Sequence, residues 1–187
     1  MTDTVPSQPE PLQLVAPTAD RLRAFEDAVE GGWSPNTTRD VRGEVLDALR
    51  SDSDGFLAEL NGTREGTVTL PDGTAVPRLP GRVFWIWDGG FCGTINVRYV
   101  PGTEELPPHV SGHVGYAVIP GKRNRGYATE ALRLVLPEAR KLGLRRVLVT
   151  CDPENVASRR VIERNGGVLR GEGTLHEEAK LEFWVEA

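Results

Sequence analysis

The stretch from Gly115 to Gly167 reads GYAVIPGKRNRGYATEALRLVLPEARKLGLRRVLVTCDPENVASRRVIERNGG. It predicts, in this order, a strand, a loop, a helix, a second strand and a second helix. Apolar residues alternate with smaller ones up to Val118, as is typical of a strand, and Pro120 ends the strand because proline has no amide hydrogen to donate. The order puts a loop directly before a helix, which is a position where ligands bind.

The loop at residues 122–128 contains three cations and one glycine. The first turn of a helix has unpaired N–H groups and the positive end of the helix dipole, and Gly126 lets the backbone approach a ligand oxygen. The loop therefore predicts a phosphate site, with a merely solvated connection as the alternative. The helix after the loop has one apolar face, which favours an ordered helix packed on a sheet. Pro137 lies on the opposite, solvent-facing side and is expected to bend the helix without breaking it. That face comprises Ala128, Ala131, Leu132, Val135, Leu136, Ala139 and Leu142.

The motif Arg123-x-x-Gly126-x-Ala128 resembles the Q/R-x-x-G-x-G/A signature of the GCN5-related N-acetyltransferases (GNAT family). The agreement extends over the whole quoted stretch, including the start of its last helix at Asn155. The resemblance implies an acetyl-CoA site in which loop amides hold the pyrophosphate, and in which the strand before the loop and an Asn after the next strand bind the pantetheine arm. The implied cofactor residues are Val118, Ile119, Arg123, Asn124, Arg125, Gly126, Tyr127, Ala128, Thr129, Asn155 and Ser158.

The other strand and helix patterns predict an α+β fold with a mixed, mostly antiparallel central sheet flanked by helices. We expect strands at 12–15, 67–70, 82–87, 92–99, 112–119, 146–151, 168–173 and 180–185. We expect helices after Thr18, after Thr37 or Thr38, as a short turn at 56–60, and in the quoted stretch. The 112–119 and 146–151 strands are expected to run parallel through a right-handed crossover. The resemblance further implies a sheet splayed between its fourth and fifth strands.

Length and composition restrict the class of protein. A chain of 187 residues predicts one domain, here residues 12–187, after a flexible tail at 1–11. The net charge of -5 argues against nucleic acid as a partner. The sequence has no long apolar run or signal peptide, so we expect a cytoplasmic protein that does not bind membranes. Its three histidines and two distant cysteines lack the spacing of metal ligands, and no metal is expected. The two cysteines, Cys92 and Cys151, are expected to be buried thiols.

Transfer of an acetyl group to an amine requires a neutral amine, an oriented carbonyl and a proton for the leaving thiolate. His113 is the first candidate base, because its ordinary pKa is near neutral and its position is predicted to face the entrance of the cleft. A surface role for this histidine is the alternative. Glu104 and Glu105 compete as bases or as carboxylates that attract a cationic amine.

The residue that would protonate the leaving thiolate differs from the family pattern. Many members of the family have a Tyr seven residues after the Asn, and here that position is Ile162. Ser158, three residues after Asn155, lies on nearly the same helix face and can donate a hydrogen bond instead, as in branches of the family that acetylate protein N-termini. Tyr116 is a further candidate, and an ordered water is the alternative to both.

These patterns predict an N-acetyltransferase that transfers the acetyl group of acetyl-CoA directly to a primary amine in a ternary complex. The amine belongs to a small molecule, a protein N-terminus or a lysine. The alternatives are an acyl-CoA-binding sensor without turnover and a structural or interaction domain whose loop is only solvated. We expect a monomer or a homodimer, and we expect the acceptor to bind the variable segments at 33–60 and 100–111.

Overall fold

The computed structural model describes residues 11–62, 65–70, 73–175 and 178–187. The expected tail at 1–11 therefore lies almost wholly outside the described residues. The strands are β1 Gln13–Val15, β2 Thr67–Thr69, β3 Ala75–Pro77, β4 Gly81–Trp87, β5 Phe91–Arg98, β6 Val114–Val118, β7 Arg146–Cys151, β8 Val168–Leu175 and β9 Glu178–Glu186. The α-helices are α1 Leu22–Glu30, α2 Arg42–Ser51, α3 Ser53–Leu60, α4 Tyr127–Lys141 and α5 Val156–Arg164. Two short 3-10 turns, Ala19–Arg21 and Pro120–Lys122, precede α1 and α4.

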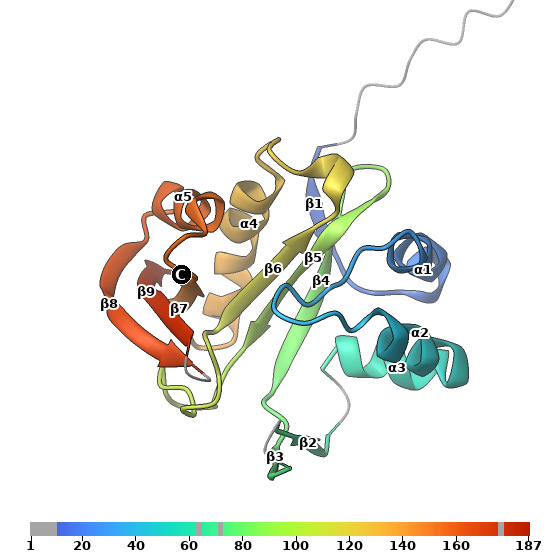
Figure 1. Ribbon diagram of the computed structural model, residues 1–187, viewed down its shortest axis with the longest axis horizontal. Helices are drawn as coiled ribbons and strands as arrows, with labels where there is room; N and C mark the ends of the chain where they lie inside the picture. The colour runs from blue at the N-terminus through green and yellow to red at the C-terminus, as the bar shows by residue number, and fades with distance from the viewer. Residues whose placement is uncertain (1–10, 63–64, 71–72, 176–177) are drawn as a thin grey trace, which may run out of the picture.

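The strands form two main sheets that diverge from each other (Figure 1). One sheet has the order β1-β4-β5-β6 and the other has the order β7-β9-β8, while β2 and β3 form a separate hairpin. All the strand pairs within these sheets are antiparallel. The α+β class is confirmed, with β6 at the edge of the first sheet and β7 at the edge of the second.

The two sheets join near the start of β6. The amide of His113 donates to the carbonyl of Leu148 at 2.7 Å, and the amide of Leu148 donates to Nδ1 of His113 at 2.9 Å. Gly112 permits this approach, because a Cβ there would lie 2.8 Å from the Leu148 carbonyl oxygen. Beyond this point no backbone pair joins β6 to β7 in the described part of the chain. The expected parallel neighbours therefore touch at one end and splay apart at the other.

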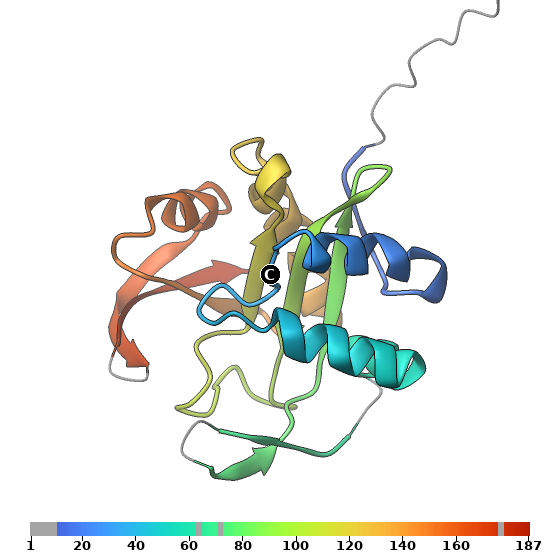
Figure 2. The same cartoon turned by 45° about the vertical axis from the view of Figure 1, so that its right-hand side comes forward.

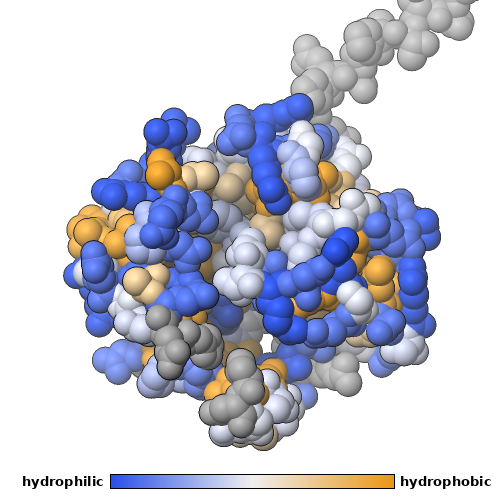
Figure 3. Space-filling view, viewed as in Figure 1, coloured by the Kyte–Doolittle hydropathy of each residue, from blue (hydrophilic) through white to orange (hydrophobic). Residues whose placement is uncertain are grey.

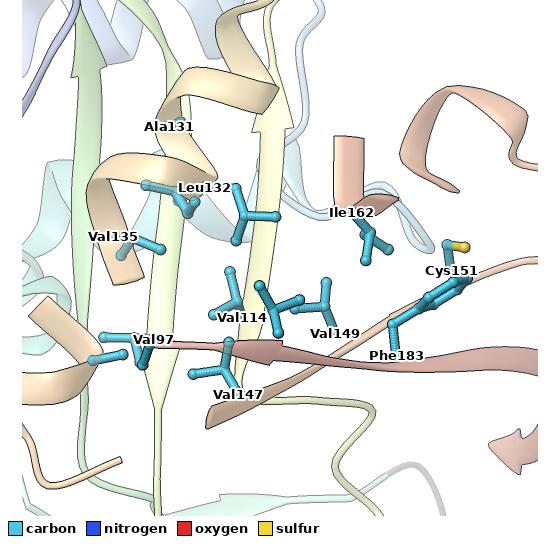
Figure 4. Close-up of a cluster of buried hydrophobic side chains, with 14 of the residues drawn as sticks. Val97, Val114, Ala131, Leu132, Val135, Val147, Val149, Cys151, Ile162 and Phe183 are labelled. Atoms are coloured by element: carbon cyan, nitrogen blue, oxygen red, sulfur yellow. The ribbon is translucent and has the colours of Figure 1, made fainter. Parts of the chain in front are cut away.

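A cluster of buried side chains from α4, α5 and both sheets holds the diverging strands together (Figure 4). The predicted apolar face of α4 is confirmed, since Ala131, Leu132, Val135 and Ala139 are fully buried. The helix is continuous through Pro137, so the proline does not break it. Ile162 of α5 is also fully buried here, among Val149, Cys151 and Phe183 in Figure 4. This core fixes the position of α5 relative to β6.

A second, aromatic cluster lies on the opposite face of the first sheet. Phe25 stacks on Trp85 with ring centroids 5.5 Å apart, and Trp33 and Phe91 pack edge-on against the pair. Figure 2 shows α1 and α2 lying across the strands at this face. Trp85 belongs to the core of the protein, because this side chain has no exposed surface.

The structure corrects three local predictions. Helix α2 begins after Val41, not after Thr37 or Thr38, because the side chain of Asn36 accepts the Thr38 amide and forms a turn there. The expected short turn at 56–60 is part of a full helix, α3. The side chain of Asp52 caps the N-terminus of this helix by accepting the Gly55 amide at 2.9 Å. The hairpin partner β3 was missed because its run ends in Pro77, and a proline within a short run argues against a strand.

Candidate active site

A cleft of about 1420 Å³ extends along the splayed edge of β6. Its walls come from the loop before α4, one face of α5 along its whole length, the segment after α1 and residues 109–111. The space-filling view in Figure 3 shows mainly hydrophilic residues around the hollow between the two halves of the molecule. The cleft thus combines segments that lie far apart in the sequence.

The loop before α4 presents a row of free amides to one end of the cleft. Within the described chain, none of the backbone N–H groups of residues 124–129 donates a hydrogen bond, and the first helical bond runs from Glu130 to Gly126. Asn124 and Gly126 have positive φ angles of 59° and 82°, which turn successive amides toward one side. Such a row, at the positive end of a helix, binds anions.

The cations of this loop divide into different roles. Lys122 forms an ion pair with Asp88 of the β4–β5 turn, and the Tyr127 hydroxyl donates to the same carboxylate at 2.5 Å. Arg123 folds back, with its Nε donating to the Val118 carbonyl at 3.0 Å. Arg125 is exposed and does not line the cleft, whereas Arg123, Asn124, Gly126, Tyr127, Ala128 and Thr129 do.

The carboxylate of Asp88 fixes the loop to the neighbouring turn. Burial works to raise the pKa of Asp88, but hydrogen bonds from Lys122, Tyr127 and Cys92 outweigh burial and lower this pKa to about 2. The group is therefore ionised at all ordinary pH values, so its ion pair with Lys122 does not depend on pH in that range.

The edge of β6 leaves backbone groups facing the gap. The Ile119 amide donates to the Cys92 carbonyl at 3.0 Å, and the His113 carbonyl accepts from Arg98, so the odd-numbered residues of β6 bond to β5. In an antiparallel pair the alternate residues, here Tyr116 and Val118, direct their backbone groups away from that partner. Ile119 does not line the cleft, whereas Val118 and Tyr116 do. The predicted backbone role of Ile119 is thus corrected, because β5 already binds its amide.

Two hydroxyl groups meet across the gap. The Tyr116 hydroxyl of β6 lies 2.7 Å from the Ser158 Oγ of α5, and both residues line the cleft. Burial raises the pKa of Tyr116 to about 12, so its hydroxyl stays protonated and can donate a hydrogen bond. Asn155 caps α5 by accepting the Ser158 amide at 3.0 Å, which fixes this serine at the first turn of the helix.

The predicted bases lie elsewhere. His113 is fully buried at the sheet junction, where its Nδ1 accepts a hydrogen bond from the Leu148 amide, and it does not line the cleft. Burial lowers the pKa of His113 to about 4. Glu105 is exposed outside the cleft, and Glu104 forms ion pairs with Arg145 and Arg146. The expectation that His113 faces the cleft entrance is therefore wrong, and neither glutamate lines the cleft.

Sequence reasoning missed the polar floor of the cleft. Thr94, Asn96 and Arg98 alternate along β5 and all line the cleft. The signal was present, because three polar residues at a spacing of two interrupt an otherwise apolar strand. Cys151 also lines the cleft, and burial raises the pKa of its thiol, which disfavours the nucleophilic thiolate.

Among the described residues, no group of three His, Cys, Asp or Glu side chains is arranged to hold a metal ion. None of the described helices has the length and apolar character needed to cross a membrane.

Comparisons with known proteins agree with this geometry. Two solved structures share the fold. The RimJ protein of Mycobacterium smegmatis, solved in complex with CoA-disulfide, has a TM-score of 0.64 and 21% identity over 94% of this chain and 82% of its own. An acetyl transferase from Salmonella typhimurium, described as modifying the N-terminal serine of ribosomal protein L7/L12, has a TM-score of 0.60 and 16% identity over 94% of this chain and 95% of its own.

Sequence comparison supplies the family. An uncharacterized N-acetyltransferase of Bacillus subtilis (strain 168), YnaD, is 38% identical over 61 residues. That match covers 32% of this chain and 35% of YnaD, so it spans about a third of this relative. The model of the acetyltransferase (GNAT) domain matches residues 63–168, more than half of the chain. The chain therefore belongs to the GNAT acetyltransferase family.

Proposed function

We propose that this protein is an N-acetyltransferase that transfers the acetyl group of acetyl-CoA directly to a primary amine. The observation that carries the proposal is one continuous cleft, which joins the row of free amides at 124–129 to the Tyr116–Ser158 hydroxyl pair. The membership of the family and the CoA-disulfide bound by the Mycobacterium smegmatis relative support this ligand.

The residues present fit acetyl-CoA. Six consecutive amides without partners suit a pyrophosphate, which offers several acceptor oxygens and negative charge. The outward-facing backbone groups of Tyr116 and the outward-facing amide of Val118, whose carbonyl accepts from Arg123, suit the amides of the pantetheine arm in the manner of an added strand. The side-chain amide of Asn155, whose oxygen caps α5, leaves its nitrogen as a donor in the same gap.

The acetyl thioester supplies the group to be transferred: the amine nitrogen bonds to the acetyl carbon while the carbon–sulfur bond breaks. Ser158 and Tyr116 stabilise the departing sulfur, with Ser158 Oγ donating a hydrogen bond to it and the phenol supporting Ser158. The lining includes neither His113 nor Glu105 but does include His109, so the proton of the amine passes to His109 or to water. This arrangement suits an acceptor that arrives with part of its population already neutral.

None of the predicted bases lines the cleft, and this supports one alternative function. A protein that binds acyl-CoA without turnover needs the amide row and the cleft but no proton acceptor beside the amine. The two functions differ in whether free CoA appears when an amine is added.

The test has two measurements. The first is calorimetric titration with acetyl-CoA of the native protein, of Gly126→Glu and of the matched control Gly121→Glu. Gly121 has an ordinary backbone conformation, open space around it and no place in the cleft. We expect Gly126→Glu to abolish binding, since it adds a carboxylate to the anion site and strains a positive φ, while Gly121→Glu keeps binding within about threefold.

The second measurement follows release of free CoA with a panel of primary amines and a thiol reagent. Release with any amine supports the transferase. Binding without release for the whole panel supports the acyl-CoA-binding alternative, and absence of binding by the native protein refutes both.

A further inference from the structure

Arg98 lies at the far end of β5 and lines the cleft without a charged partner. In the described part of the chain its guanidinium forms neither a hydrogen bond nor an ion pair, and its Nε is buried with no partner. Burial lowers the pKa of Arg98, yet a guanidinium keeps its charge in proteins. An unpaired buried charge is costly unless a ligand pairs with it.

The surroundings provide no substitute for an anion. Of the described residues that line the cleft, Asp152 alone has a carboxylate, and Lys180 is already paired with it. The Oδ1 of Asn96 accepts the Gly115 amide at 3.0 Å. Arginine has five donors and no acceptor, so its natural partner is an oxygen-rich anion in the plane of the guanidinium.

The geometry directs Arg98 toward the middle of β6. A Cβ on Gly115 would lie 3.3 Å from the Nη2 of Arg98, so the guanidinium lies against the bare backbone of Gly115. Gly115 immediately precedes Tyr116, the residue whose hydroxyl meets Ser158. Arg98 therefore lies against the middle of β6, on the face of the sheet that also carries Thr94 and Asn96, while the side chain of Tyr116 points to the other face.

The phosphate loop is too distant to explain this cation. Arg98 bonds to His113, before β6 begins, whereas the loop follows Val118 at its other end. Five residues of strand separate these points, a span of about 16 Å. The pyrophosphate site and the guanidinium therefore serve different groups.

We propose that the acceptor is an amine that also carries an oxyanion, a carboxylate or a phosphate, and that Arg98 binds this oxyanion and so selects the acceptor. This inference rests on the proposed transferase function and names the substrate class of the same cleft. Arg98 forms a bidentate ion pair with the oxyanion, while the amine extends past Gly115 toward the thioester. Arg98 is thus a specificity-determining residue that takes no part in proton transfer.

The experiment measures binding of matched amines to the complex with CoA, in which no transfer takes place. Saturation-transfer NMR compares β-alanine with β-alaninamide, and phosphoethanolamine with ethanolamine, so that each pair differs in the oxyanion. We expect the native protein to bind at least one oxyanion member about ten- to a hundredfold more tightly than its neutral partner. The two pairs distinguish a carboxylate ligand from a phosphate ligand.

Two variants test the residue. Arg98→Gln removes the charge, and we expect it to abolish the preference while affinity for the neutral member changes less than about threefold. Asn96→Asp keeps the acceptor oxygen for the Gly115 amide and places a carboxylate beside Arg98. The new carboxylate pairs with the positive charge of the guanidinium while the Arg98 side chain keeps its full length. This variant should also reduce the preference, which keeps the test valid should Arg98→Gln fail to fold.

The outcomes separate this inference from the proposed function. Equal binding of both members of each pair by the native protein, or a preference that survives in both variants, overturns the role of Arg98. Loss of affinity for neutral and anionic members alike in both variants assigns Arg98 a structural role and also overturns it. CoA release is scored separately: its absence refutes the transferase function, while the binding preference still decides the oxyanion site.

Discussion

The two ends of the cleft are built from different chemical groups. At the α4 end the ligand-facing groups are backbone amides of one continuous segment, residues 124–129. At the β5 end they are side chains, Thr94, Asn96 and Arg98, with walls from residues far along the chain. The comparison teaches that a shared ligand can be bound by local backbone geometry, whereas a particular acceptor is selected by side chains that the fold assembles. The following predictions test this division, in order of decreasing effect.

The Tyr116–Ser158 pair lies where the two ends meet, and its loss should produce the largest effect. We expect the double variant Tyr116→Phe, Ser158→Ala to lower kcat by about a hundredfold, the lower range for a group that assists proton transfer. Affinity for acetyl-CoA should stay within threefold, because the amide row is intact. Steady-state kinetics and calorimetry measure the two quantities.

The matched control is Arg159→Ala, on the exposed side of the same turn of α5. A double variant that keeps the native kcat would show that water, and neither hydroxyl, protonates the leaving sulfur.

His113 should control stability at the sheet junction and not the chemistry. Its pKa falls from 6.5 to about 4 on folding, so the unfolded chain binds the proton first as the pH decreases. Its contribution is therefore complete above pH 6.5 and is lost as the pH falls toward 4, a decrease of about 3 kcal/mol in the free energy of unfolding. Urea unfolding of the native protein across this range measures it.

His113→Gln should be less stable and should flatten this dependence, while kcat of the folded variant keeps its pH profile. A kcat profile that loses an inflection in His113→Gln would restore this residue as the base.

Asp88 should stabilise the phosphate loop over a lower range of pH. Its pKa falls from 3.8 to about 2 on folding, so its contribution is present above pH 3.8 and is lost as the pH decreases toward 2. We expect Asp88→Asn to reduce the free energy of unfolding at pH 7 by about 2 kcal/mol, with the difference from the native protein narrowing below pH 4. Acid titration of unfolding would contradict this if the difference stayed constant.

Arg125 should give the smallest effect, although the sequence pattern assigns it to the cofactor. Because it is exposed and does not line the cleft, we expect Arg125→Ala to weaken acetyl-CoA binding less than about threefold at physiological salt. Calorimetry at two salt concentrations measures this effect. A tenfold loss would mean that side-chain charge, and not the amide row alone, binds the phosphates.

The sequence predicted most of the fold because its signals are local. The alternation in β6, the apolar face of α4 and the glycine before that helix each lie within a few residues of one another. The acceptor end could not be predicted in this way. The assignment of His113 failed because its pKa depends on burial beneath β7, and β7 is more than thirty residues away. The absence of an ion-pair partner for Arg98 also depends on the fold, which leaves most carboxylates outside the cleft.

The sequence by itself determined the family, the order of the elements and the segment that binds an anion, because periodicity, glycine and helix termini act over one or two turns of chain. The tertiary structure alone decided which residues face the cleft. It buried His113 and Ile162, and it bonded the Ile119 amide to the Cys92 carbonyl. It also brought the Tyr116 hydroxyl within 2.7 Å of the Ser158 Oγ, although 42 residues of chain separate them. The physical reason is that burial, charge pairing and hydrogen-bond partners depend on contacts between distant segments, which exist only after the two sheets join at Gly112 and splay apart.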